Sequence, residues 1–226
     1  MIKQGLVVSA ILSGALLQAN VAMAEGTIVG KIGTLGAGLE YVHPLNSKLA
    51  IGIGVNGMSF DESLTESEID YDADLNMQSI SLLADFHPFE NGFRISAGAM
   101  QNGNEFSLVG TPVGDETVEV NGNTYTASDV GSLEAFLGFD SLAPYVGIGW
   151  GHAPKSGKGW SLDADLGVLF QGEPNASLSA TCGTALTAVA CSVLTADVAL
   201  EEQSFISDVA DFELLPVVSI GASYTF

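Results

Sequence analysis

Positively charged residues are scarce in this chain. Its 226 residues include six Lys and Arg against 27 Asp and Glu, a formal net charge of −21 at pH 7. Binding to a nucleic-acid backbone depends on many Lys and Arg contacts to phosphate. Nucleic acid is therefore excluded as a partner, and the acidic surplus predicts a solvated, self-repelling surface. Attraction of cations is the alternative interpretation of the same surplus.

Long apolar runs are also missing. The most apolar stretch, residues 5–17, follows the short basic start Met1-Ile2-Lys3-Gln4 and precedes the small-x-small motif Ala22-Met23-Ala24. It is shorter than the roughly 20 residues that a membrane-spanning helix needs. We therefore predict a signal peptide over residues 1–24 and one exported domain over residues 25–226.

Cysteine is nearly absent, with Cys182 and Cys191 the two examples. An exported chain meets an oxidising compartment, where two thiols close in sequence pair by default. We expect one disulfide that closes a small loop. No histidine lies near these cysteines in the sequence, which argues against a metal site there.

What the chain does have is alternation. Towards the C-terminus one face carries Val218, Ile220, Ala222, Tyr224 and Phe226, and the other carries Ser219, Gly221, Ser223 and Thr225. An apolar outer face and a small or polar inner face are typical of a barrel wall in lipid. Without membrane-spanning helices, only a closed sheet satisfies every backbone group in a bilayer. The fold class predicted is all-β, a transmembrane antiparallel up-and-down β-barrel.

Eight segments alternate clearly enough to be predicted as strands: 35–41, 51–56, 70–78, 93–99, 132–139, 145–151, 160–171 and 216–226. Residues 175–182 would make a ninth strand and residues 28–32 a tenth. Bacterial single-chain barrels have even numbers of strands, so eight is the simplest solution and ten the alternative. An eight-stranded barrel is just wide enough for its own side chains.

Two intervening segments differ from the wall. The polar loop over residues 102–130 contains Asn121-Gly122, which favours a type I′ hairpin and predicts a projecting two-stranded ribbon. Residues 192–214, just before the last strand, predict one helix with Phe205, Val209 and Phe212 on an apolar stripe. We expect this helix to pack on the barrel mouth or lie at the interface, rather than plug a pore. Trp150 and Trp160 would suit an aromatic girdle.

Two resemblances support the barrel. The ending polar-x-Gly-x-x-aromatic-x-Phe, with Gly221, Tyr224 and Phe226, resembles the C-terminal assembly signal of bacterial outer-membrane β-barrels. Residues 33–41 (GTLGAGLEY), 85–89 (DFHPF) with 93–98 (FRISAG), 143–151 (APYVGIGWG) and 165–168 (DLGV) with 216–226 (PVVSIGASYTF) resemble a family of small, uncharacterised outer-membrane β-barrel proteins of Gram-negative bacteria. The resemblance implies the outer membrane as the location. Its implied partners are outer-membrane lipid, lipopolysaccharide and the barrel-assembly machinery; it implies no catalytic residue and no oligomeric state.

Some outer-membrane barrels are enzymes, so the three histidines were considered as catalytic bases. Acyl transfer needs a nucleophile beside a general base. His43 and His87 each precede a proline in an expected turn, and His152 follows a strand. None has the spacing to serine that resembles lipid A deacylase barrels, and none lies in an Asp–His pair resembling the outer-membrane protease family. We expect plain surface histidines, no catalytic residue and no enzymatic activity.

The acidic residues of the predicted wall form the one charged cluster. The alternation places Glu40, Glu134, Asp163 and Asp165 in the lumen, with Arg94 as the clear cationic partner. Asp70, Asp72 and Asp74 also point inward in this assignment and share one strand face. Close carboxylates repel one another, so we expect either a solvated ring near the rim or, as a weaker candidate, a divalent-cation site. No other cofactor is expected.

Together these features predict an integral outer-membrane β-barrel without enzymatic activity, either structural or a narrow cation-favouring pore. The first alternative is a surface ligand-binding or adhesion barrel that acts through its long loops. The second alternative is a barrel enzyme that modifies lipid.

Overall fold

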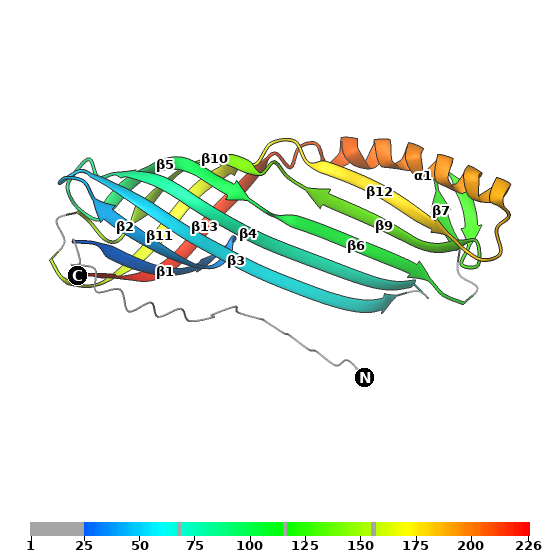
Figure 1. The fold of residues 1–226 in the computed structure, drawn as a ribbon, viewed down its shortest axis with the longest axis horizontal. Coiled ribbons are helices and arrows are strands. Elements are labelled where there is room, and N and C mark those ends of the chain that lie inside the picture. The colour runs from blue at the N-terminus through cyan, green and yellow to red at the C-terminus, as the bar shows by residue number, and fades with distance from the viewer. Residues whose placement is uncertain (1–24, 67–68, 115–116, 155–156) are drawn as a thin grey trace.

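A computed structural model describes residues 25–66, 69–114, 117–154 and 157–226 of the chain. The predicted signal peptide lies outside the described residues. The described chain forms an elongated body with a barrel at one end and a helix at the other (Figure 1). Both Thr27 and Thr225 lie at the far end of the barrel from the helix, and we call this the terminal end.

Eight strands pair in a closed ring, and each is antiparallel to both neighbours. In ring order they are β1 (Thr27–Gly33), β2 (Gly36–Pro44), β3 (Leu49–Glu66), β4 (Ile69–Phe86), β5 (Phe93–Asn102), β10 (Leu142–Trp150), β11 (Gly159–Phe170) and β13 (Leu214–Thr225). Ring order follows chain order, so the sheet is up-and-down. The predicted all-β, antiparallel up-and-down class is confirmed.

The membership of the ring differs from the prediction. Strand β1 pairs with β13 and β2 over its whole length, although residues 28–32 were only an optional strand in the sequence analysis. The predicted strand 132–139 corresponds to β9 (Val130–Gly138), which pairs with β6 and β12 outside the ring. The strand count of eight therefore holds because these two errors offset each other.

Beyond the ring, the same sheet continues through β4 into three further strands. The first half of β4, Ile69 to Asn76, leaves β5 and pairs with β6 (Glu105–Pro112). Strand β6 pairs with β9, and β9 pairs with β12 (Asn175–Cys182). We use the name extension for the outer halves of β3 and β4 with β6, β9 and β12. It also includes the short strands β7 (Thr117–Val120) and β8 (Asn123–Thr126) and the helix α1 (Ala188–Val209).

The helix of the extension is α1 (Ala188–Val209), which lies along β12 (Figure 1). It begins four residues earlier than predicted because the Thr187 hydroxyl caps it, accepting a hydrogen bond from the Ala190 amide at 3.3 Å. Its buried face consists of Leu194, Asp197 and Val198, whereas Phe212, on the predicted stripe, is exposed. The helix thus packs on the extension, so the alternative that placed it on the barrel mouth is wrong. No helix in the described part of the chain is long and apolar enough to cross a bilayer.

The hairpin of β7 (Thr117–Val120) and β8 (Asn123–Thr126) completes the extension. Asn121 and Gly122 have φ of 51° and 76°, the positive values that a type I′ turn requires, so the predicted turn is confirmed. The hairpin does not project freely. It packs against the helix and sheet around a core of Val120, Val130, Leu194 and Val198.

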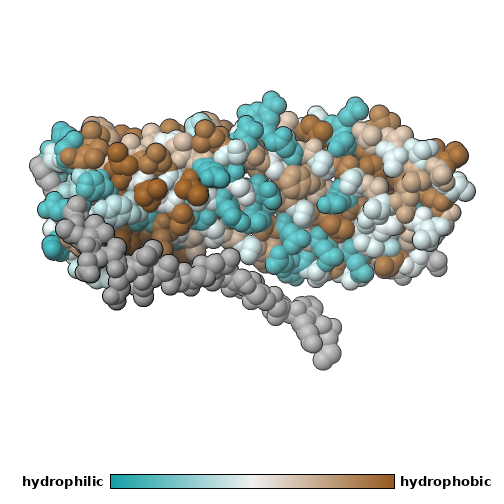
Figure 2. All heavy atoms as spheres, viewed as in Figure 1, coloured by the Kyte–Doolittle hydropathy of each residue, from teal (hydrophilic) through white to brown (hydrophobic). Residues whose placement is uncertain are grey.

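The outer wall of the ring is apolar. Along β13 the exposed residues Val218, Ile220, Ala222 and Tyr224 alternate with less exposed ones, as predicted. Leu162 on β11 is 81% exposed. Figure 2 shows apolar side chains gathered over the barrel, with hydrophilic ones at the terminal end and over the middle of the molecule. Trp150 and Trp160 are both exposed near the terminal end, and Trp160 packs on Tyr224 with ring centroids 5.2 Å apart.

Candidate functional site: the barrel lumen

Two layers of side chains fill the barrel. The layer nearer the extension, which we call the apolar plug, consists of Leu35, Met77, Leu83, Met100, Ala143, Tyr145, Leu169 and Val217. A cavity of about 20 Å³ lies beside it, which is enough space for about one water molecule. The layer nearer the terminal end is charged, and we call it the charge layer.

Arg94 on β5 is the centre of the charge layer. Its side chain is 5% exposed, and it donates hydrogen bonds to Asp163 Oδ1 at 3.2 Å and to Asp165 Oδ1 at 2.5 Å. Ser219 Oγ donates to the other oxygen of Asp165 at 3.1 Å. The alternation predicted that Arg94 neutralises inward carboxylates, and the structure brings Arg94, Asp163 and Asp165 together. Gly149 makes room for them, since a Cβ there would lie 2.4 Å from Asp165 Oδ1.

A second ion pair lies in the same layer. Lys31 Nζ donates to Glu40 Oε2 at 2.5 Å, with side-chain exposures of 12% and 8%. Glu40 was predicted to face the lumen, but Lys31 was missed because β1 was not counted as a firm strand. Asp85 on β4 was also missed. It is buried and accepts a hydrogen bond from Ser96 Oγ at 2.5 Å; its alternation with Ser81 and Leu83 would have found it.

The histidines correct another expectation. His87 and His152 were expected at the surface, yet both are buried. The connections at the terminal end fold inward, with the His87 amide bonded to Lys48 O at 2.7 Å and the Gly151 amide to Gly92 O at 3.0 Å. Burial lowers the pKa of His87, which lies in the turn after β4.

Each buried imidazole uses one nitrogen. His152 Nδ1 lies 2.7 Å from Asp163 Oδ1, and His87 Nδ1 lies 3.0 Å from the backbone oxygen of Asn91. The two ring centroids are 6.3 Å apart, in an edge-to-face arrangement. The Asp–His contact was excluded in the sequence analysis because Asp163 and His152 are eleven residues apart and meet only through the β10–β11 connection.

Four predicted lumen acids lie elsewhere. Glu134 is exposed on β9, in the extension, and Asp70, Asp72 and Asp74 are exposed on the outer half of β4. Asp70 accepts from Thr65 Oγ1 at 2.6 Å and Asp72 from Ser63 Oγ at 2.5 Å. A hydrogen bond with Asp61 raises the pKa of Asp74.

The three aspartates of β4 therefore face separate partners on β3 and do not converge. Within the described residues, no group of three His, Cys, Asp or Glu side chains is placed to surround one metal ion. The structure thus gives no support to the weaker cation-site interpretation of Asp70, Asp72 and Asp74.

The remaining predicted residues lie at the two ends. Cys182 and Cys191 are joined in a disulfide, which ties the end of β12 to the first turn of α1. Gly221 lies on β13 opposite Asp163, and a Cβ there would come within 2.3 Å of Gly30 O. The Phe226 amide donates to Gly26 O at 3.1 Å, next to the exposed ring of Tyr224.

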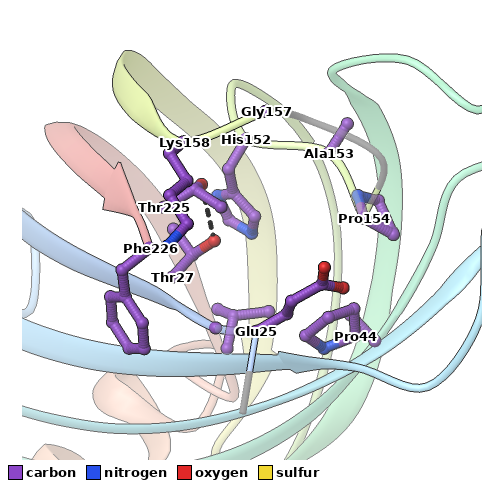
Figure 3. Close-up of a pocket in the computed structure, with 13 residues that line it drawn as sticks. Glu25, Thr27, Pro44, His152, Ala153, Pro154, Gly157, Lys158, Thr225 and Phe226 are labelled. Atoms are coloured by element: carbon purple, nitrogen blue, oxygen red, sulfur yellow. Dashed lines mark hydrogen bonds between the residues drawn. The ribbon is translucent and has the colours of Figure 1, made fainter. Parts of the chain in front are cut away.

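A pocket of about 530 Å³ opens at the terminal end (Figure 3). Thr27 and Thr225 line it, with their hydroxyl groups 2.9 Å apart. Val42 and Ala50 provide buried apolar wall. His152 also lines the pocket (Figure 3), and its Nδ1 contacts Asp163 of the charge layer. The pocket therefore connects solvent at the terminal end with the buried histidine.

Comparison with solved structures agrees with this architecture. The chain is similar to Acinetobacter baumannii CarO2, with 24% identity, a TM-score of 0.59, and coverage of 89% of this chain and 98% of that one. It is also similar to Acinetobacter baumannii CarO, with 21% identity, a TM-score of 0.57, and coverage of 92% and 100%. At these identities the likeness shows the fold alone. No protein-family model matches the chain, and neither does any curated protein.

Proposed function

We propose that this protein is an integral outer-membrane β-barrel of a Gram-negative bacterium, with a structural and non-enzymatic role. The barrel anchors the extension at the membrane surface and does not itself form an open pore. The observation that carries the proposal is a ring of eight strands with an apolar outer face and a filled lumen. The likeness to the two CarO structures supports the same fold.

The outer face supports membrane insertion. Strands β10, β11 and β13 are 9, 12 and 12 residues long, comparable with the roughly 9–11 residues of a tilted membrane-spanning strand. Large side chains such as Leu162 and Ile220 are more than half exposed around this ring. A continuous apolar belt of this extent is far larger than soluble monomers expose, so lipid is the solvent it suits.

The ends of the barrel support an orientation. Outer-membrane barrels have short periplasmic turns and long extracellular segments. The terminal end has the short connections between β2 and β3 and between β4 and β5, whereas the extension is at the opposite end. We therefore orient the extension outside the cell.

Charge is divided along the same axis. The segments that supply the extension and its connections, 57–78, 103–141 and 171–213, contain 21 Asp and Glu and no Lys, Arg or His. The extension is thus uniformly anionic, which keeps it solvated and repels other anions. This division favours a display or spacing role for the extension over contact with nucleic acid or other polyanions.

The apolar plug favours the structural role over the narrow cation-favouring pore, and conductance tests the choice. We expect the purified protein to give no steady unitary conductance in planar bilayers. Replacing Leu83 and Met100 by Ala together should produce conductance because it removes side chains from the plug. The matched control is Leu194→Ala, which truncates an equally buried leucine in the extension and should leave the bilayer silent.

Two outcomes would overturn the proposal. Steady cation-selective conductance of the unmodified protein would establish the pore. Recovery of the protein in the soluble fraction after urea or carbonate extraction of membranes would remove the membrane location.

A further inference from the structure

His87 and His152 each keep one ring nitrogen without a hydrogen-bond partner. Both imidazoles are more than nine-tenths buried. Each makes a hydrogen bond through Nδ1, His152 to the Asp163 carboxylate and His87 to the Asn91 carbonyl. In both rings Nε2 is buried and has no hydrogen-bond partner. An unpartnered buried polar atom is costly, and two such atoms in neighbouring rings require an explanation.

We propose that His87 and His152 bind a divalent transition-metal ion of the zinc class through their Nε2 atoms. Histidines that ligate a metal donate their other ring N–H to a carboxylate or a backbone carbonyl. Both acceptors are present here. A hydrogen on Nδ1 leaves the lone pair on Nε2, which is the atom a metal needs.

The spacing of the rings fits one ion. With Zn–N bonds of about 2.0–2.1 Å, two imidazoles on one ion have centroids about 5 Å apart at a tetrahedral angle and about 6.4 Å apart when the nitrogens lie opposite each other. The observed separation of 6.3 Å lies at the wide end of this span, close to the arrangement with the two nitrogens opposite each other. Among the described residues no group of three His, Cys, Asp or Glu side chains is placed to hold a metal ion, so water would complete the coordination.

The charge of the surrounding layer also favours a divalent cation. Four carboxylates face two cationic side chains there: Glu40, Asp85, Asp163 and Asp165 against Lys31 and Arg94. Two negative charges are left in excess among groups that are almost fully buried. Buried charge is tolerated when it is balanced, and one divalent ion would balance it.

The ligand atoms determine the class of ion. Imidazole nitrogen suits Zn²⁺, Cu²⁺, Ni²⁺ and Co²⁺, whereas Ca²⁺ and Mg²⁺ take oxygen ligands. The terminal-end pocket of about 530 Å³ is lined by His152 and so approaches one of the two rings from solvent (Figure 3). The inference does not rest on the proposed function, since the site depends on the folded barrel and not on its conductance or location.

Zn²⁺ titration of the full, folded chain in detergent, by calorimetry at neutral pH, tests the proposal. We expect one ion per chain, and at least a tenfold loss of affinity in both His87→Gln and His152→Gln. His43→Gln is the matched control, because His43 stacks beside Tyr41 on β2 with centroids 6.5 Å apart, away from the charge layer. Its affinity should be unchanged. Circular dichroism without metal verifies that each variant is folded.

A second measurement identifies the ligands. Cu²⁺ bound at one equivalent should give electron paramagnetic resonance couplings from two imidazole nitrogens, reduced to one in either glutamine variant. Absence of stoichiometric Zn²⁺ binding would overturn the proposal. So would Zn²⁺ binding that survives in both variants, or that equimolar Ca²⁺ displaces, because either result would assign the ion to the acidic extension.

Discussion

Replacing Arg94 by Ala should destabilise the barrel strongly. The guanidinium is the shared partner of Asp163 and Asp165, and its side chain is 5% exposed. Removing one partner of a buried ion pair typically costs about 3–5 kcal/mol, because the remaining charge stays buried without compensation. Asp163 would keep its contact with His152, and Asp165 would keep the Ser219 hydroxyl. We therefore expect a loss at the lower end, about 3 kcal/mol.

The carboxylates cause this loss, so neutralising one should recover part of it. Asp163→Asn in the Arg94→Ala background removes a buried charge, and the amide oxygen can still accept from His152. We expect about 1–2 kcal/mol to return, of the order of a buried hydrogen-bonded charge. The same Asp163→Asn change alone should destabilise the protein, because Arg94 then keeps one carboxylate partner, Asp165. Asp163→Asn should thus lower the free energy of unfolding of the parent protein and raise that of the Arg94→Ala variant, which gives a non-zero coupling energy in a double-mutant cycle.

Urea unfolding of the folded barrel in detergent or lipid vesicles measures these free energies. Fluorescence of Trp150 and Trp160, both exposed on the outer wall, reports the transition, and the heat-dependent shift in gel mobility gives an independent check. An Arg94→Ala protein as stable as the parent would refute the reasoning. A double variant no more stable than Arg94→Ala would show that uncompensated charge is not the cause.

Three further predictions concern the two ends of the molecule. Deleting Phe226 should reduce the heat-modifiable barrel in outer-membrane fractions, because the resembled assembly signal ends in that aromatic residue; a normal amount would contradict this. Mass spectrometry of non-reduced peptides should find Cys182 bonded to Cys191, and replacing both by Ser should speed proteolysis near α1 while the barrel survives. Hydrogen bonds from Tyr125, Asn121 and Asn123 lower the pKa of Asp197, and the bond to Asp197 raises the pKa of Tyr125 to about 12. The contact of hairpin and helix should therefore hold at neutral pH, weaken as pH falls below the ordinary Asp value of 3.8, and weaken as pH rises from 10 towards 12. Hydrogen exchange of the hairpin measures both limits, and Tyr125→Phe should remove the alkaline one.

The features that could be predicted are those that depend on local pattern. Alternation with period two identifies the outer face of β13 from its own residues. The Asn121-Gly122 turn follows from the positive φ that its backbone twist requires. Arg94 could be matched with Asp163 and Asp165 because so few cations are available to inward carboxylates.

The features that could not be predicted are non-local. The burial of His87 and His152 depends on how the connections at the terminal end fold over the lumen, and nothing in a turn sequence specifies that direction. Lys31 lies within a short, glycine-containing strand, where one charged residue obscured the alternation of β1. The buried face of the helix was predicted wrongly for a related reason. That face includes Asp197, whose carboxylate is hydrogen-bonded by residues of the hairpin more than 70 positions earlier in the sequence.

Strand β4 explains why Asp70, Asp72 and Asp74 were assigned to the wrong side. Even-numbered residues are exposed along nearly the whole strand, from Asp70 to Phe86, so their side chains all lie on the same, outer face of the sheet. Ile80 and Leu82 on that face are on the barrel wall and must point outward. The aspartates share their parity, and outward carboxylates are too costly inside lipid. The wall must therefore leave the membrane between Asp74 and Ile80. If the strand had been predicted to continue unbroken to residue 86, its even-numbered face would have contained both the aspartates and Ile80 and Leu82, and the sequence would have located the beginning of the extension. The predicted strand ended at residue 78, so this comparison could not be made.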